Sequence, residues 1–479
     1  MSINKETFYI GGEWVSPKSS KTFTLINAST EEAIGTVPEA CEADVDAAVA
    51  AARATFDNGS WSGLAPAERA AVMERFMGAL ASRGDAIAQA VSMQNGMPIA
   101  LSSQLEAQFP MGILQYYASL APEMGKPDVR PSQMGKETLV ERSPLGVVAA
   151  IVPWNFPVTL AMNKIAPAML AGCTLVIKPS PGTILDSYIV AEAAHEAGVP
   201  AGVLNWVAAD RDVGAYLVSH PGVDKVAFTG STGAGRKIAA TCGELLRPVT
   251  LELGGKSAAI LLEDADLGTF LQGVPMASML NNGQACYNGT RVLAPKKRYS
   301  EVVDALAGFA KSLNVGDALD PETHVGPMAS GEHRDKVLSY IEIGKGEARL
   351  AAGGSAPASQ NRGFFVEPTI FADVDNSARI AREEIFGPVL AVIPYDGEDD
   401  AIRIANDSDY GLGGSVWSAD SAHATAVAQK VASGTVGVNG YMPSLGAPFG
   451  GIKASGLGRE FGPDAVSSYQ NTKSIYVMG

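Results

Sequence analysis

The first half of the chain alternates short apolar runs with longer segments of helical periodicity. Five such runs follow one another at intervals of about 25 residues: VVAAIV (147–152), TLVIKP (174–179), VLNWVAA (203–209), KVAFTGS (225–231) and PVTLELGG (248–255). Continuous apolar runs of this length are typical of strands that are buried on both faces of a sheet. The pattern therefore predicts a parallel sheet covered by helices, in the doubly wound arrangement of dinucleotide-binding domains.

A second alternation of the same kind begins after Gly254 and Gly255. Its strand-like runs are SAAILLED (257–264), TRVLAP (290–295), FFVEPTIF (364–371), VLAVIPYD (389–396), GSVWSAD (414–420) and TVGVNG (435–440). Helical segments lie between most of these runs, which predicts a second α/β domain. The expected fold class is therefore α/β, with two doubly wound, Rossmann-like domains.

Two further segments alternate polar and apolar residues as exposed strands do. They are GKETLVERSP (135–144) and the tail SYQNTKSIYVMG (468–479). Edge strands of this kind present unpaired backbone N–H and C=O groups, which invite pairing with another subunit. We therefore expect a small β element that serves oligomerisation.

Length and charge narrow the class of protein. A chain of 479 residues, 46% of them hydrophobic, is long enough for two or three domains with sizeable cores. The formal net charge of −15 argues against nucleic acid and anionic membrane surfaces as partners. The most apolar region, 144–177, is interrupted by prolines and polar residues, so it does not predict a membrane span.

The four cysteines, Cys41, Cys173, Cys242 and Cys286, are widely spaced and form no CxxC pair. This spacing argues against a disulfide framework and a cysteine-based zinc site, so no metal is expected. It suits a reducing compartment, and the first ten residues, MSINKETFYI, lack the apolar core of a secretion signal. The expected location is the cytoplasm.

A glycine-rich turn, FTGSTGAGR (228–236), joins the fourth predicted strand to a helix. Gly230 would let a ligand approach the backbone, and Ser231 would begin a helix whose free N–H groups attract phosphate. The glycine order is not GxGxxG, and the stretch alone fits a turn without a ligand equally well. Its place at the carboxyl end of a parallel strand favours the ligand. Lys178 ends another strand of this sheet and would reach the same crevice, although strand-end lysines are most often only solvated.

Three groups with complementary chemistry are expected at the mouth between the two domains. Asn155, in PWNFP, follows the first strand, and Glu252, in LELGG, ends the fifth. Cys286 lies in a polar turn, NNGQACYNG (281–289). An amide donor, a carboxylate and a thiol supply an oxyanion stabiliser, a general base and a nucleophile, which together suit acyl chemistry. Taken singly, each residue also fits a structural role, as a turn former, a surface residue or a core filler.

The order of these and other motifs resembles that of the NAD(P)-dependent aldehyde dehydrogenase superfamily. The resemblance rests on PWNFP, KPS, FTGSTGAG, LELGGKS, GQAC, EEIFGPV and PFGGIKASGLGRE, and it runs from about residue 8 to the C-terminus. It implies that the chain oxidises an aldehyde to the carboxylic acid with NAD or NADP as the acceptor.

The resemblance also implies a division of the chain. Residues 1–122 and 145–253 would form an NAD(P)-binding domain, and residues 254–454 a catalytic domain. Residues 123–144 and 455–479 would form the bridging element of a homodimer or homotetramer.

By this resemblance Cys286 attacks the aldehyde to form a thiohemiacetal, which becomes a thioester when a hydride leaves. The side-chain amide of Asn155 and the backbone N–H of Cys286 would hold the oxyanion, and Glu252 would activate the water that releases the acid. Lys164 matches a lysine that relays a proton or orients the other groups.

The resemblance further assigns residues to the cofactor and to the substrate. The residues expected to bind the cofactor are Trp154, Lys178, Pro181, Gly230, Ser231, Gly254, Glu384 and Phe386. Those expected to line the substrate tunnel are Phe156, Asn163, Tyr287 and Phe449. This mixed polar and aromatic set does not select one aldehyde.

Two positions depart from the family pattern. Pro181 stands where many members have an acidic residue, so we expect NADP to be accepted beside NAD. Asn471 stands where many have a glutamate that is proposed as a second base, which puts more of the hydrolysis on Glu252.

Two other functions remain open at this point. A relative that transfers the acyl group to coenzyme A would tend to lack the base, so Glu252 speaks against it. A catalytically silent paralogue would tend to lose the catalytic set, so the joint presence of Cys286, Glu252 and Asn155 speaks against that.

Overall fold

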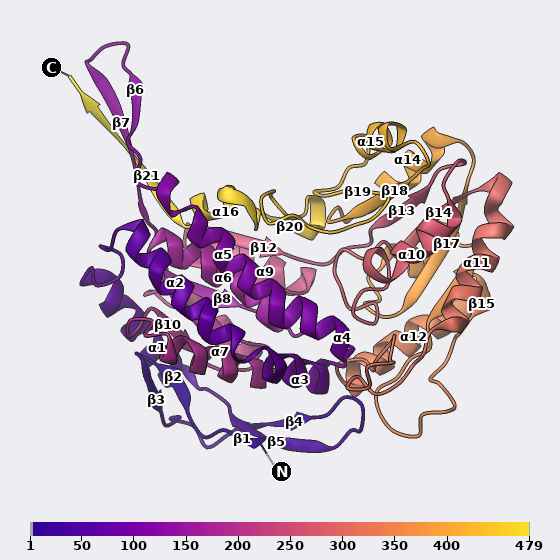
Figure 1. Cartoon of the computed structure of the whole chain (residues 1–479), viewed down its shortest axis with the longest axis horizontal. Helices are drawn as coiled ribbons and strands as arrows, with labels where there is room; N and C mark the ends of the chain where they lie inside the picture. Colours follow the sequence, from indigo (N-terminus) through magenta and orange to yellow (C-terminus); the bar gives the residue numbers. More distant parts are fainter. Residues whose placement is uncertain (1–2, 479) are drawn as a thin grey trace.

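Two large sheets form the centres of two lobes, and a narrow β arm projects from the first lobe (Figure 1). The structure is a computed structural model, and it describes residues 3–478. A third, three-stranded sheet lies near the N-terminus, in the order β1 (Ile3–Asn4), β5 (Ala33–Pro38) and β4 (Thr22–Ile26).

The first large sheet is doubly wound. Its spatial order is β20 (Gly456–Leu457), β12 (Val249–Glu252), β11 (Lys225–Thr229), β8 (Val147–Ile151), β9 (Thr174–Lys178), β10 (Leu204–Trp206), β2 (Phe8–Ile10) and β3 (Glu13–Val15). The five strands from β12 to β10 run parallel and are the five predicted from the sequence, so that prediction is confirmed. The chain builds from β8 outward to β10 and then returns to β11 on the other side of β8. The switch point, where ligands bind in such sheets, therefore lies between β8 and β11.

Helices cover both faces of this sheet (Figure 1). One face is covered by α2 (Pro66–Ala81), α3 (Gly84–Asn95), α5 (Phe109–Ser119), α6 (Pro157–Ala171) and α7 (Leu185–Glu196). Between α3 and α5 lie α4 (Ile99–Ser102) and the π-helix η1 (Ser103–Gln108), followed beyond α5 by the short η2 (Ala121–Glu123). The other face is covered by α1 (Glu42–Asp57), α8 (Arg211–Ser219) and α9 (Thr232–Glu244).

The second large sheet is also mainly parallel. Its order is β15 (Arg349–Ala352), β16 (Thr369–Ala372), β17 (Val389–Tyr395), β14 (Arg291–Pro295), β13 (Ala258–Leu261), β18 (Gly414–Trp417) and β19 (Gly437–Val438). One face packs on α10 (Leu267–Ala277) and α11 (Tyr299–Ser312), which follows the short η3 (Lys296–Arg298). The other face packs on α12 (Gly331–Glu347), α13 (Arg379–Arg382), α14 (Glu398–Asn406) and α15 (Ser421–Ala428). The two-sheet α/β fold class is thus confirmed.

Two strands of the second sheet differ from the expectation. The predicted strand 364–371 begins only at residue 369, because Phe364 pairs with Ala28 and Met328 instead and Pro368 has no N–H to donate. The edge strand β15 was not predicted, since its sequence, RLAA, carries little β propensity.

The C-terminal segment 455–479 divides between two sheets. Following η4 (Lys453–Ser455), β20 pairs with β12 of the first sheet, and α16 (Gly462–Ser467) packs against α6. Only β21 (Gln470–Val477) joins the arm. Of the residues from 455 onward, only β21 therefore lies in the arm, and the division of the chain into domains stays a prediction.

The arm is a three-stranded antiparallel sheet in the order β21, β7 (Glu137–Pro144) and β6 (Asp128–Pro131). β21 pairs with β7 along its whole length, from Gln470 opposite Pro144 to Val477 opposite Glu137. β7 is therefore the central strand rather than the exposed edge that its sequence suggested, and β21 and β6 are the two edge strands of the sheet.

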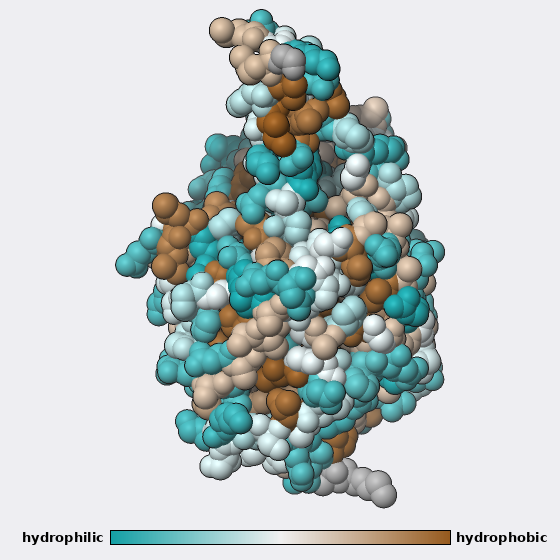
Figure 2. Space-filling view, turned by 90° about the vertical axis from the view of Figure 1, so that its left-hand side faces the viewer, coloured by the Kyte–Doolittle hydropathy of each residue, from teal (hydrophilic) through white to brown (hydrophobic). Residues whose placement is uncertain are grey.

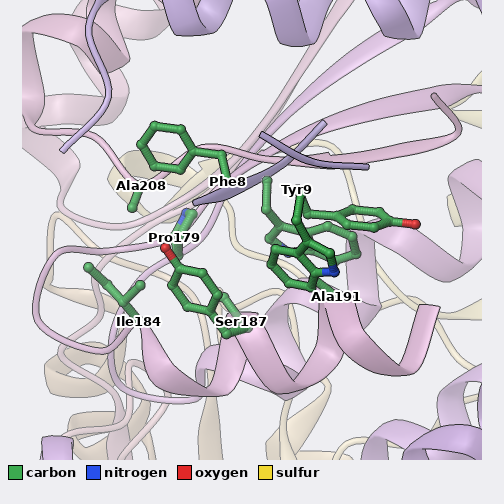
Figure 3. Close-up of a pocket in the computed structure, with 10 residues that line it drawn as sticks. Phe8, Tyr9, Pro179, Ile184, Ser187, Ala191 and Ala208 are labelled. Carbon is green, nitrogen blue, oxygen red and sulfur yellow. The ribbon is translucent and has the colours of Figure 1, made fainter. Parts of the chain in front are cut away.

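A small aromatic recess lies where the N-terminal hairpin meets α7 (Figure 3). β2 contributes Phe8 and Tyr9 to its lining and α7 contributes Ser187 and Ala191, and the ring of Trp14 stacks on that of Tyr188. None of the predicted catalytic residues lines this recess, so we regard it as a packing contact between the N-terminal hairpin and α7.

Candidate active site

The carboxyl ends of the parallel strands meet a turn of the second lobe at one cavity of about 690 Å³. The predicted residues that line it are Trp154, Asn155, Gly230, Ser231, Gly254, Cys286, Glu384 and Phe386. They come from both lobes, and β8 and β11, which flank the switch point, supply the first four. The cavity thus brings the predicted nucleophile together with most of the predicted cofactor residues.

Cys286 is half-buried in a turn that is held by amide side chains. Asn281 donates from Nδ2 to the carbonyl oxygen of Asn155 (2.9 Å), and Asn95 donates to the same oxygen (3.0 Å). Burial, and then the nearby Glu384 and Glu252, raise the pKa of the Cys286 thiol. The thiol is therefore neutral at rest and needs a base to become a nucleophile.

Asn155 is buried, and its side-chain amide points at the turn that carries the thiol. Nδ2 donates to the carbonyl oxygen of Gln284 (2.9 Å), two residues before Cys286. An amide nitrogen has two hydrogens, so the second remains for an oxygen that develops charge beside Cys286.

Glu252 is 2% exposed, and neither carboxylate oxygen has a hydrogen-bond partner among residues 3–478. Burial, and then the charge of Glu460, raise the pKa of this carboxyl well above its usual range. A Cβ on Gly450 would lie 2.4 Å from Glu252 Oε1, so only glycine leaves room for the carboxylate there. A buried carboxyl of this kind suits a general base that takes a proton from water.

Lys164 forms a buried ion pair with Glu460, a residue that the sequence argument did not single out. Nζ lies 2.6 Å from Glu460 Oε1 and donates to the Thr229 hydroxyl, and Asn163 donates to Glu460 Oε2 (3.3 Å). Glu460 follows the glycines of GLGRE, and nothing in that pattern distinguished it from a solvated loop residue. Its charge reaches Glu252, and so it belongs to the electrostatics of the site.

The cofactor side of the cavity contains a helix N-terminus, a glycine at which a ligand can come close to the backbone, and a carboxylate. Ser231 caps α9 by accepting from the Ala234 N–H (3.3 Å), and a Cβ on Gly230 would collide with the ring of Phe228. Glu384 accepts from the Gly255 N–H (2.9 Å) with one oxygen, which leaves the other free for a ribose hydroxyl. This donor set fits the phosphates and sugars of a dinucleotide.

The cavity residues that the sequence did not single out include His333 and Lys336. Burial lowers the pKa of His333 to about 4, so the ring is neutral at pH 7. Its Nε2 lies 2.7 Å from the carbonyl oxygen of Phe386, and its ring contacts Trp154. Lone helix residues such as these carry no motif, because only the folded chain places them beside Trp154 and Phe386.

Lys178 and Pro181 lie outside the residues that line this cavity, farther along the same edge of the sheet. Burial lowers the pKa of Lys178 to about 8, while the charge of Asp210 opposes that shift. Asp210 caps α8 and was not predicted; it places one carboxylate near Lys178 even though residue 181 is proline.

An aromatic row extends from the nucleophile away from the cofactor side. Ring centroids are 6.4 Å apart for Tyr287 and Phe449, 5.9 Å for Phe449 and Phe461, and 6.3 Å for Phe461 and Phe109. Phe156 is buried in the same apolar cluster. Asn163, expected in this tunnel, is instead turned toward Glu460 with its Nδ2.

Glu106 accepts hydrogen bonds from the backbone that follows Asn155 and so stabilises one wall of the site. Its Oε2 accepts from the N–H groups of Val158 (2.7 Å) and Thr159 (3.4 Å) at the start of α6, directly after Asn155 and Phe156. The side chain is fully buried, which raises its pKa to about 8, so the carboxyl is mostly protonated at pH 7.

Glu106→Gln should therefore be tolerated, because a glutamine carbonyl also accepts from these N–H groups. Glu106→Ala leaves buried donors unpaired and should lower the free energy of unfolding by about 1–3 kcal/mol. Urea denaturation of both variants measures the difference. Equal destabilisation by the two variants would contradict this assignment.

Among the described residues no group of His, Cys, Asp and Glu side chains could hold a metal ion, and no helix is long and apolar enough to cross a membrane.

The fold and the cavity define a two-lobe α/β protein with a dinucleotide-type site and a buried thiol. The sequence matches the model of the aldehyde dehydrogenase family over residues 14–475. It is 59% identical over its full length to the full-length geranial dehydrogenase of Castellaniella defragrans.

Solved structures of aldehyde dehydrogenases are also similar to this chain. An aldehyde dehydrogenase of Mycobacterium tuberculosis complexed with NAD+ superposes with a TM-score of 0.97 at 45% identity, over 100% of this chain and 99% of that one. A mutant of aldehyde dehydrogenase C from Pseudomonas syringae, complexed with NAD+ and octanal, superposes with a TM-score of 0.95 at 39% identity, over 98% and 96%. The chain belongs to the aldehyde dehydrogenase family.

Proposed function

We propose that this protein oxidises an uncharged, apolar aldehyde to the carboxylic acid with NAD+, through a covalent thioester on Cys286. The observation that carries the proposal is the single cavity in which Cys286 and Asn155 face a dinucleotide-type site, with Glu252 buried behind them. When bound, NAD+ supplies the acceptor for the hydride that leaves the aldehyde carbon. We further propose that the protein works in the cytoplasm.

In the first half-reaction the thiol of Cys286 releases its proton to solvent water, and the sulfur adds to the aldehyde carbon. The carbonyl oxygen becomes an oxyanion, which the second amide hydrogen of Asn155 and the backbone N–H of Cys286 stabilise. When this oxyanion collapses, the carbon–hydrogen electron pair leaves as hydride and a thioester remains on Cys286.

In the second half-reaction water adds to the thioester, and the thiolate leaves. Glu252 takes the proton from water, as its burial and raised pKa suit. Lys164 and Glu460 form an ion pair, and both charges influence the pKa of Glu252. We propose that this pair orients the Glu252 carboxyl and relays the proton that Glu252 has taken from water. Hydrolysis needs no acyl acceptor other than water, which distinguishes this function from transfer to coenzyme A.

The substrate class follows from the aromatic row beside Cys286. Its ring contacts bury apolar groups well but offer no guanidinium or ammonium group for an aldehyde that carries a carboxylate. The similarity to a geranial dehydrogenase and to an enzyme solved with octanal supports the same class.

The test is an aldehyde panel with NAD+ and without coenzyme A. We expect octanal and geranial to be converted to their acids with kcat/KM at least about a hundredfold above succinate semialdehyde, which carries a carboxylate, since two apolar contacts contribute roughly 3 kcal/mol. Equal use of the charged aldehyde would contradict the assigned class, and a strict need for coenzyme A would contradict hydrolysis.

Cofactor choice should respond to charge at positions 181 and 210. A charge-assisted hydrogen bond contributes roughly 1.5–3 kcal/mol, so we expect NAD+ to be preferred but NADP+ to be accepted at a measurable rate. Pro181→Glu should reduce kcat/KM for NADP+ about ten- to hundredfold more than for NAD+. Asp210→Asn keeps the α8 cap, removes the charge beside Lys178 and should raise NADP+ use.

A wild-type preference for NAD+ beyond about a thousandfold that neither variant changes would show that the shape of the adenosine pocket decides instead.

The arm should join subunits into a dimer, or into a tetramer built from dimers. It carries large exposed apolar side chains, among them Met134 (88% exposed) and Tyr476 (70%), and Figure 2 shows apolar surface on this projection. The outer edge of β21 adds backbone groups for pairing.

Light scattering at micromolar concentration should find no monomer in the wild type. The double variant Met134→Asp, Tyr476→Asp should shift the mass downward, whereas Gln133→Asp, also on the arm, should not. A fully active wild-type monomer would contradict the assignment.

A further inference from the structure

A second cavity lies at the junction of the two lobes. It is open to solvent, with an empty space of about 760 Å³, and it shares no lining residue with the cavity that contains Cys286. One wall is formed by α4 and η1 of the first lobe, and the other by α10, α11 and the loop 323–325 of the second. Small-molecule sites occur preferentially at such junctions between domains.

The walls of this cavity are mainly apolar. Leu101, Met276, Met279, Phe309 and Leu313 line it, and none of its described lining residues is Asp, Glu, Lys or Arg. A charged molecule would lose its hydration there without a partner, so the cavity suits an uncharged one.

Two polar side chains in the walls lack a partner. Asn281 (1% exposed) and Thr323 (5% exposed) each have a buried oxygen, Oδ1 and Oγ1, with no hydrogen-bond partner among the described residues. A buried acceptor without a donor is unfavourable, so a bound molecule that carries one hydroxyl group would relieve it. The apolar walls and these two oxygens together select an amphiphile with a single polar end.

Asn281 also connects this cavity to the nucleophile turn. Its Nδ2 donates to the carbonyl oxygen of Asn155 (2.9 Å), while its Oδ1 is the oxygen that lacks a donor. Asn281 and Asn282 have φ values of 52° and 58°, a left-handed conformation that costs free energy in non-glycine residues. A molecule that fixes the Asn281 amide would therefore act on the group that positions Asn155.

We propose that this second cavity binds an uncharged, largely apolar alcohol, at the same time as an aldehyde occupies the tunnel beside Cys286. The aliphatic chain packs against Met276 and Phe309, and the hydroxyl donates to Asn281 Oδ1 and accepts from Thr323. Because Asn281 holds Asn155, occupancy changes kcat and leaves the KM for the aldehyde unchanged.

Isothermal titration calorimetry with 1-octanol tests the site without any turnover, so its outcome does not depend on which aldehyde the enzyme oxidises. The matched probe is 1-methoxyheptane, which has the same atoms but no O–H donor. We expect 1-octanol to bind at least about fivefold more tightly than the ether, the ratio that one net hydrogen bond gives.

Two variants locate the site. Thr323→Val keeps the side-chain shape and removes the hydroxyl, so it should weaken the binding of 1-octanol and leave that of the ether unchanged. Thr241→Val, at a half-buried position of α9, is its control. Ala100 is exposed at the rim of the cavity, and Ala100→Trp should close it and abolish binding while aldehyde oxidation without the alcohol stays at the wild-type rate.

Crystals soaked with 8-bromo-1-octanol give an independent location through the anomalous signal of bromine. A peak between η1 and α11 is the expected result. A peak only beside Cys286, 1-octanol that competes with the aldehyde and ignores both variants, or no binding at all would each overturn the proposal.

Discussion

Cys286→Ala is expected to abolish aldehyde oxidation, with a loss of roughly a thousandfold or more in kcat, because the covalent path then has no nucleophile. Any esterase activity should disappear as well, since it uses the same sulfur. NAD+ binding should survive, because the cofactor-side groups Ser231 and Glu384 are untouched. Steady-state kinetics and calorimetric titration with NAD+ measure the two properties separately.

Cys41→Ser is the matched control. Cys41 is also a partly exposed thiol, but it lies at the start of α1 with its Sγ near Asp44, far along the chain from the site. This variant should keep full activity. If Cys286→Ala retained more than about 1% of wild-type oxidation, Cys286 could not be the nucleophile.

Glu252→Gln should separate the two half-reactions. The amide has the shape of the carboxyl but does not take a proton from water, so the thioester should form and then persist. Rapid mixing should show a burst of NADH close to one equivalent per active site, followed by turnover that is slower by about two to four orders of magnitude.

The pH dependence of thioester hydrolysis provides a second measurement of the role of Glu252. Because burial raises the pKa of Glu252, its base form increases as pH rises, and wild-type thioester hydrolysis should accelerate through that range. Glu252→Gln should lose this acceleration. Loss of the burst with an unchanged steady state would mean that another group activates the water.

The arrangement around Asn155 was within reach of the sequence. Parallel strands place their carboxyl ends at one edge, so a motif after β8 and another after β11 had to converge once the doubly wound order was assigned. The assignment of Cys286 to the same mouth followed from its unusually polar surroundings, which a core cysteine does not have. Both expectations depended on the position of a residue along a strand or turn, which sequence patterns express.

Glu460 and His333 show what such patterns cannot express. Glu460 reaches Lys164 only because β20 returns the C-terminal segment to the first sheet, and that return left no periodic signal in two strand residues. His333 lies on α12 and meets Trp154 only across the junction of the lobes. Long-range pairings of this kind depend on the packing of whole elements, and no local pattern encodes them.

The arm shows a further limit. The alternation in 135–144 and 468–479 correctly predicted strands, but a single chain does not state whether two exposed-looking strands pair with each other or with another subunit. In the structure they pair with each other, and only β21 keeps an outer edge. Glu106 was missed for a related reason. From sequence alone, a glutamate in a helix is expected on the surface, and only the folded structure shows that it accepts hydrogen bonds from the N–H groups of Val158 and Thr159.

The most direct test of the central claim is mass spectrometry of the Glu252→Gln variant after one mixing with octanal and NAD+. We expect an octanoyl group on the peptide that contains Cys286, formed only when NAD+ is present and absent in the Cys286→Ala, Glu252→Gln double variant. An acyl group on any other residue, or oxidation of octanal with no acylated peptide at any time point, would contradict it.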